Sequence, residues 1–204
     1  MQYAEKVREN SMKWDTCLYD DKHSFVTEYG KELLDFVPCN KAQRILDIGC
    51  GTGSLTVNLS KQCGYVLGID CSSEMIEKAR KQYPDIDFEV MDALELPFSR
   101  KWDIVFSNAV FHWIPNHGLL LSKIHHALKP TGKLICEFGA HGNIETIERG
   151  FSDALQETGY VYHSKFVFPT IEEFRNALTN NGFFIDEIYD YETNAFARRR
   201  ARLR

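Results

Sequence analysis

Residues 44–53, which read Arg-Ile-Leu-Asp-Ile-Gly-Cys-Gly-Thr-Gly, contain the pattern from which the fold can be inferred. The apolar residues at its start predict a buried β-strand, Arg44–Ile48, and three glycines follow within five residues: Gly49, Gly51 and Gly53. Glycine lets the backbone adopt positive φ angles and approach a ligand closely. A helix after the loop would add free N–H groups at its first turn. The stretch therefore predicts a strand, a ligand-binding loop and a helix, as at the start of an α/β domain.

The spacing of the glycines separates this loop from the common dinucleotide-binding loop. The pattern G-x-G-x-x-G would place its third glycine at position 54, where this chain has Ser54. Asp47 also stands two residues before the first glycine, and its carboxylate would repel a pyrophosphate and attract a cation. We therefore expect a cationic ligand here. The alternative is a glycine turn that only allows tight packing of strand and helix.

Short apolar runs alternate with helical stretches along the rest of the chain. Most of the runs are continuous rather than alternating, as in parallel strands that are buried on both faces. The predicted strands are 44–48, 65–69, 87–91, 103–108, 133–138 and 183–189. This order predicts a doubly wound, mostly parallel Rossmann-like sheet with helices on both faces. Ligands bind such sheets at the carboxyl ends of the strands.

Caps and breakers mark the ends of the predicted helices. Ser72 can cap one helix, and Thr170 with Glu173 has the spacing of a capping box. Pro38 stops a helix over 24–37. The other helices are expected from Leu55 to Gly64, from Leu120 to Pro130, and over 143–158.

The loop Asp47-Ile48-Gly49-Cys50-Gly51-Thr52-Gly53 resembles the glycine motif of class I S-adenosylmethionine-dependent methyltransferases. The sulfonium and the amino group of that cofactor are cationic, in agreement with Asp47. The resemblance implies that Asp70 accepts the ribose hydroxyls, although it could simply cap the next helix. It implies that Asp92 accepts from the adenine amino group beside Ala93, although Asp92 could be a solvated turn residue. Cys71 and Met75 would cover the purine ring, but packing in the core is the stronger interpretation for Met75.

The segment Ser107-Asn108-Ala109-Val110-Phe111-His112-Trp113 resembles a small-molecule subgroup that includes trans-aconitate and malonyl-carrier-protein methyltransferases. The resemblance places Asn108 and Ala109 beside the methionine part of the cofactor. It places His112 and Trp113 at the transferable methyl group, with His112 as the candidate base if the acceptor needs one. The sequence is equally consistent with two structural roles instead: a His112 that makes only local hydrogen bonds and a Trp113 that packs in the core. Tyr19, in an N-terminal lid, would cover the cofactor carboxylate or lie at the surface.

The composition and the charge of the chain limit the classes of function that it can have. The chain has 204 residues, 44% of them hydrophobic and 26% charged, which fits one globular domain. Its net charge is −5, but 198–204 hold five arginines, and without them 19 basic residues face 29 acidic ones, a balance of −10. An acidic body argues against a nucleic-acid partner. We expect no membrane segment, no metal, six reduced cysteines and a cytoplasmic protein, monomer or dimer.

The end of the chain departs from the family pattern. Class I methyltransferases carry a seventh, antiparallel strand between the fifth and sixth, and the residues after Tyr191 do not form a convincing partner strand. We therefore expect the seventh strand to be missing or altered, which would leave the edge of the fifth strand open to pairing with another chain. The expected segments are an N-terminal helical lid (1–40), a cofactor-binding α/β domain (41–191) and a basic tail (192–204). A truncated or altered end explains the tail; a basic arm for an acidic partner is the alternative.

The resemblance implies methyl transfer to a small molecule by in-line displacement, with a carboxylate as one candidate acceptor. The main alternative is a cofactor-binding but inactive methyltransferase-like subunit. A nicotinamide oxidoreductase is disfavoured by the glycine spacing and Asp47. A nucleic-acid methyltransferase is disfavoured by the acidic body and by the lack of an N/D-P-P-Y motif.

Overall fold

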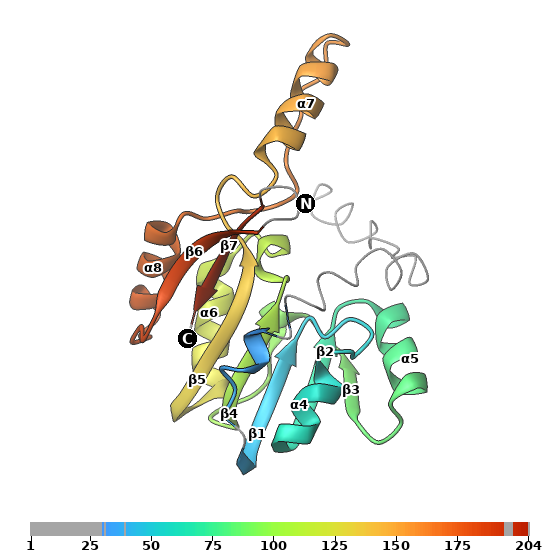
Figure 1. Ribbon diagram of the computed structural model, residues 1–204, viewed down its shortest axis with the longest axis vertical. Coiled ribbons are helices and arrows are strands. Elements are labelled where there is room, and N and C mark those ends of the chain that lie inside the picture. The colour runs from blue at the N-terminus through green and yellow to red at the C-terminus, as the bar shows by residue number, and fades with distance from the viewer. Residues whose placement is uncertain (1–29, 31, 39, 194–197, 204) are drawn as a thin grey trace, which may run out of the picture.

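A computed structural model describes residues 30, 32–38, 40–193 and 198–203, and its centre is a seven-stranded sheet (Figure 1). The strand order is β3-β2-β1-β4-β5-β7-β6. Strands β1 to β5 are parallel, and β7 is antiparallel to both of its neighbours. The strand bounds are β1 Asn40–Ile48, β2 Cys63–Asp70, β3 Asp87–Val90, β4 Trp102–Asn108, β5 Leu128–Gly139, β6 Ile188–Thr193 and β7 Arg198–Leu203.

Helices connect the strands, and two of them begin where the sequence predicts a cap. The hydroxyl of Ser72 accepts a hydrogen bond from the Met75 N–H at the start of its helix. Thr170 and Glu173 form the expected capping box, in which each side chain accepts from the other residue's backbone. The helix bounds are α4 Thr56–Gln62, α5 Ser73–Gln82, α6 His117–Ala127, α7 Glu145–Gln156 and α8 Ile171–Asn180, with 3-10 turns η1 Ala93–Glu95 and η2 Phe111–Trp113.

The two faces of the sheet bury two different cores. Because side chains alternate along a strand, Ile45 packs with Leu59 of α4 on one face, whereas Leu46 packs with Leu120 of α6 on the other. Phe174 of α8 belongs to the same core as Leu120. The doubly wound arrangement, with helices on both faces, is therefore confirmed.

The seventh strand was expected to be missing or altered, and the structure shows that it is not missing. Arg198–Leu203 forms it: Cys136 of β5 lies opposite Leu203, and Tyr191 of β6 lies opposite Arg200. The interpretation of 192–204 as a basic tail outside the domain is corrected with it. The physical reason is that strand pairing is made by backbone N–H and C=O groups, which an arginine-rich segment supplies like any other.

The sixth strand also begins later than predicted. The sequence pattern placed it at 183–189, whereas β6 is Ile188–Thr193 and the preceding residues form a loop. Phe184 in that loop is 99% exposed, so an apolar side chain there does not mark a buried strand. Of the expected lid, Gly30 and Glu32–Leu34 are helical, while Tyr19 and most of 1–40 lie outside the described residues.

Within the described part of the chain, none of the helices combines the length and apolar character that crossing a membrane requires. The described residues also contain no cluster of three or more His, Cys, Asp or Glu side chains suited to a metal ion. The four described cysteines, Cys50, Cys63, Cys71 and Cys136, are free thiols. Helix α7 extends away from the rest of the molecule (Figure 1) and has no buried residue.

Candidate active site at the carboxyl edge of the sheet

The glycine loop joins the carboxyl ends of β1 and β2. Gly49 and Cys50 both donate their N–H groups to the carbonyl of Ile69, at 2.8 and 3.0 Å. Gly49, Gly51 and Gly53 have φ angles of +70°, +54° and +84°. These left-handed conformations are the reason that glycine is needed at each position.

The surroundings of the three glycines differ. A Cβ atom on Gly49 would collide with the side chain of Val110, and one on Gly53 would lie 2.7 Å from Cζ of Phe88. A Cβ atom on Gly51 would meet nothing within 4 Å. The outer glycines therefore allow close packing, whereas Gly51 presents bare backbone to open space, as a loop that cradles a ligand requires.

Asp70, at the end of β2, is fixed by the loop and by its own turn. Gly51 donates its N–H to Oδ2 at 3.0 Å, and Ser72 donates its N–H to Oδ1 at 2.9 Å. Burial raises the pKa of the Asp70 carboxyl, although the two N–H donors oppose this. Each carboxylate oxygen retains a lone pair for a further donor. A pair of neighbouring hydroxyls, as on a ribose, matches that geometry.

Asp47 is buried, with 2% of its surface exposed, and its Oδ2 accepts from the Thr56 hydroxyl at 2.7 Å. The pKa of the Asp47 carboxyl is raised to about 7, mainly by burial, which the Thr56 hydrogen bond opposes and the nearby charge of Asp70 reinforces. Because Asp47 is enclosed, it would attract a cation over the loop through its electrostatic field and not by direct contact.

The end of β3 presents Asp92 and Ala93. Asp92 is exposed, and its Oδ1 accepts from the Leu94 N–H at 2.8 Å, so that it caps η1. Ala93 is buried. The end of β3 is tied to β2, because Met91 donates its N–H to the carbonyl of Asp70 at 2.9 Å. The strand ends that carry Asp70 and Asp92 thus lie together.

Three more predicted cofactor residues lie in the glycine loop and at the start of the helix that follows β2. Met75 is 3% exposed, which agrees with the packing interpretation of its side chain. Cys71 is exposed, and Cys50 is half-buried. Burial, followed by the charges of Asp47 and Asp70, raises the pKa of the Cys50 thiol, so this sulfur is not an activated nucleophile.

The end of β4 holds strained backbone. Ala109 has φ +61°, an uncommon value for a residue with a side chain, and donates its N–H to the carbonyl of Glu137 at 2.7 Å. Asn108 is buried, and its side chain lies so close to Gly30 that a Cβ atom there would be 2.8 Å from Asn108 Nδ2. Such strain persists where surrounding structure enforces it, and it gathers at functional sites.

An aromatic cluster adjoins this strand end, and it includes two residues that sequence reasoning missed. The ring of His112 lies 5.6 Å from that of Trp113 and is stacked on Phe168 at 5.6 Å. Trp113 meets Phe166 edge to face at 4.5 Å. Phe166 and Phe168 come from the segment between α7 and α8. Their alternation in Phe166-Val167-Phe168 is a signal for a shared face, but nothing in the sequence pairs that face with His112.

Glu137, near the end of β5, is fully buried and accepts from the Tyr191 hydroxyl of β6 at 2.8 Å. Two residues further along, Gly139 lies against Phe168 and Asn143. Tyr191 had no sequence signal, because it reaches Glu137 only through the position of β6 in the sheet.

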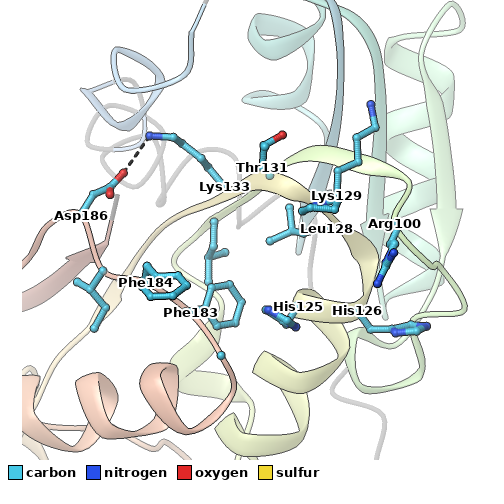
Figure 2. A pocket seen from close by; sticks show the side chains of 15 residues that line it. Arg100, His125, His126, Leu128, Lys129, Thr131, Lys133, Phe183, Phe184 and Asp186 are labelled. Atoms are coloured by element: carbon cyan, nitrogen blue, oxygen red, sulfur yellow. Dashed lines mark hydrogen bonds and ion pairs between the residues drawn. The ribbon is translucent and has the colours of Figure 1, made fainter.

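Two surface pockets lie elsewhere. The larger, of about 670 Å³, is formed by the start of β5, the end of α6 and the loop before β6 (Figure 2). In Figure 2 the ion pair between Lys133 and Asp186, at 2.9 Å, spans one side of it. The other, of about 570 Å³, lies between α4, β2 and the turn before β3. Neither includes a predicted site residue, so the strand-end geometry rather than pocket volume defines the candidate site.

Known proteins share this arrangement. Residues 46–136 match a family described as "Methyltransferase domain". The trans-aconitate 2-methyltransferase of Variovorax paradoxus is 34% identical over 60% of this chain and 49% of that protein. The chain spans about half the length of the trans-aconitate 2-methyltransferases that it matches.

Solved structures agree on the fold. The methyltransferase in complex with the Trm112 activator of Haloferax volcanii superimposes with a TM-score of 0.71 at 23% identity, covering 91% of this chain and 84% of that one. A Haemonchus contortus phosphoethanolamine N-methyltransferase 2 in complex with S-adenosyl-L-methionine gives 0.65 at 26% identity, covering 82% and 38%.

The sheet topology, the glycine loop and these similarities identify a class I S-adenosylmethionine-dependent methyltransferase domain. Within that class the chain resembles the trans-aconitate 2-methyltransferases. The cofactor of the class is S-adenosylmethionine, and the open space over Gly51 with the anchored carboxylate of Asp70 fits an adenosyl group.

Proposed function

We propose that this protein binds S-adenosylmethionine at the carboxyl edge of its sheet and methylates a small-molecule carboxylate by in-line displacement. The observation that carries the proposal is the pairing of Gly51 with Asp70: backbone open to a ligand, next to a carboxylate held by that backbone. When bound, the cofactor supplies an electrophilic methyl group, whose carbon bonds to the acceptor oxygen as the carbon–sulfur bond breaks and its electron pair passes to sulfur.

The strand ends supply the binding residues. Asp70 would accept the ribose hydroxyls with the lone pairs that Gly51 and Ser72 leave available. Asp92 would accept from the adenine amino group, with Cys71, Met75 and Ala93 along the ring. The glycine loop, Asp47, Asn108, Ala109 and Tyr19 would hold the methionine part, as the resemblance implies.

His112 and Trp113 would face the reacting methyl group. An aromatic ring beside a sulfonium is favourable through cation–π attraction. A carboxylate acceptor is supported by the named activity of the Variovorax relative and by simple chemistry, because a carboxylate is already a nucleophile at neutral pH. The protein would then contribute chiefly alignment and exclusion of water.

Calorimetry and methyl transfer test the proposal together. The purified chain should bind S-adenosylmethionine, and labelled cofactor should transfer its methyl group to at least one member of a panel of carboxylic acids. Failure to bind the cofactor with an intact fold would overturn the proposal. Binding without transfer to any acid, amine or alcohol would favour the inactive, partner-type subunit. A protein of similar fold has been solved in complex with the Trm112 methyltransferase activator of Haloferax volcanii, so a pull-down that looks for a partner of this chain is a useful second measurement.

A further inference from the structure

The imidazole of His112 has one nitrogen committed to the protein backbone. Gly139, the last residue of β5, donates its N–H to His112 Nδ1 at 3.2 Å. A backbone N–H can only donate, so Nδ1 must contribute its lone pair to this bond. The ring is also held by its stacking on Phe168, and the His112 carbonyl accepts from the Val167 N–H at 2.9 Å.

This bond determines where the proton of the ring resides. A neutral imidazole carries one N–H and one lone pair, and here the lone pair is at Nδ1. The N–H is therefore at Nε2. A doubly protonated ring would place a second N–H directly opposite the N–H of Gly139. The ring can thus donate through Nε2, and it has no lone pair there with which to remove a proton.

From this geometry we infer that His112 is a positioning residue that donates through Nε2–H and is not a general base. The inference rests on the proposed function and restricts its acceptor class. The attacking atom must already be free of a proton at working pH, as in a carboxylate or another oxyanion. Alcohols and protonated amines would need a base that His112 cannot supply. The expectation that His112 is the candidate base is replaced by this assignment.

The proton position can be measured without any cofactor or acceptor. In protein with ¹⁵N-labelled histidine, nitrogen shifts and long-range couplings identify the protonated nitrogen of each ring. His117 is an internal reference, because its Nε2 lies 2.9 Å from the Phe111 carbonyl, which can only accept. His112 should show the same Nε2–H tautomer as His117 near neutral pH. A proton at Nδ1, or on both nitrogens, would overturn the inference.

Two matched substitutions separate donor from base in the catalysed reaction. The amide of His112→Gln can still place an N–H near the position of Nε2, whereas the shorter amide of His112→Asn reaches only the position of Nδ1, where its carbonyl can accept from Gly139. Neither amide can serve as a base. A donor role predicts that His112→Asn lowers kcat/KM for a carboxylate roughly 10- to 100-fold, with His112→Gln clearly less affected. The wild type and His112→Gln should share one pH profile between about pH 6 and 9, where an imidazole changes charge.

The outcome that opposes the inference is equally specific. Equal losses in both variants, of roughly 10²- to 10⁴-fold, together with disappearance of a histidine-like limb from the pH profile, would show base catalysis. Circular dichroism and cofactor affinity of the variants confirm that fold and cofactor site persist. If the wild type binds no cofactor, the proposed function fails, and the tautomer measurement still judges the inference about His112.

Discussion

At the scale of single residues, the candidate site depends on carboxyl groups whose environments differ. Asp70 is partly buried and fixed by two backbone donors, whereas Asp47 is fully enclosed and bonded to one hydroxyl. The first arrangement leaves oxygen lone pairs for a ligand. The second raises the free energy of the ionised form of Asp47, because the carboxylate is removed from water. The two acids should therefore respond differently to substitution.

Asp70→Ala should weaken binding of S-adenosylmethionine, because it removes the acceptor proposed for the ribose hydroxyls. A hydrogen bond to a charged group contributes roughly 1.5–3 kcal/mol, so the loss should be at least about tenfold in Kd. Isothermal titration calorimetry measures it. Asp85→Ala is the matched control, since it removes the same charge from an exposed turn before β3, at the opposite end of that strand from Asp92. Equal affinity for wild type and Asp70→Ala would refute the ribose assignment.

The raised pKa of Asp47 makes stability depend on pH. Its carboxyl keeps a proton up to about pH 7 in the folded chain, whereas the ordinary pKa of an aspartate is 3.8. Between these values the folded state binds more protons than the unfolded state, so the free energy of unfolding falls as pH rises. The loss is complete above about pH 7, and its upper limit is about 4 kcal/mol.

Asp47→Asn should remove this dependence, because the amide stays neutral and can still accept from Thr56. Urea unfolding at pH 5 and pH 8 gives the measurement. The difference in stability between variant and wild type should shift in favour of the variant at the higher pH. A difference that does not change with pH would show that Asp47 titrates as an ordinary carboxyl group.

At the scale of elements, the glycine loop separates structural from ligand-related roles. Gly49→Ala places a methyl group against Val110 at a positive φ, so it should destabilise the fold by more than the roughly 1–2 kcal/mol of backbone strain alone. Gly51→Ala incurs the strain without a collision. We therefore expect Gly51→Ala to fold but to bind cofactor weakly, as seen by thermal melting and calorimetry side by side. Unaltered affinity in Gly51→Ala would mean that no ligand passes over this residue.

The elements also show where sequence signals are reliable. Ser72 and the pair Thr170–Glu173 predicted helix starts correctly, because capping is a local hydrogen bond between neighbours in sequence. The start of β6 was misplaced, because Phe183 and Phe184 suggested a buried strand whereas Phe184 is exposed in a loop. Whether an apolar residue is buried depends on what lies over it, and that is not local.

At the scale of the whole molecule, β7 completes the sheet between β5 and β6. A chain that ends at Thr193 should lose the backbone hydrogen bonds of β7, at about 0.5–1.5 kcal/mol each, and should expose the edge of β5. We expect a lower free energy of unfolding and self-association, measured by urea unfolding and analytical ultracentrifugation. The control, Arg199→Gln with Arg202→Gln, lowers the positive charge but keeps the strand backbone. A stable, monomeric truncated chain would show that β7 contributes little.

The sequence by itself determined the α/β class, the strand that leads into the glycine loop, and the spacing of Asp47, Asp70 and Asp92. These features depend on neighbours along the chain and on the strand-to-strand repeat. Only the tertiary structure decided the pairing of β7, the contact of Phe168 with His112, and the bond from Gly139 that assigns the His112 proton. These contacts and hydrogen bonds connect segments that are far apart in sequence. They follow from the packing of whole elements, which no local pattern encodes.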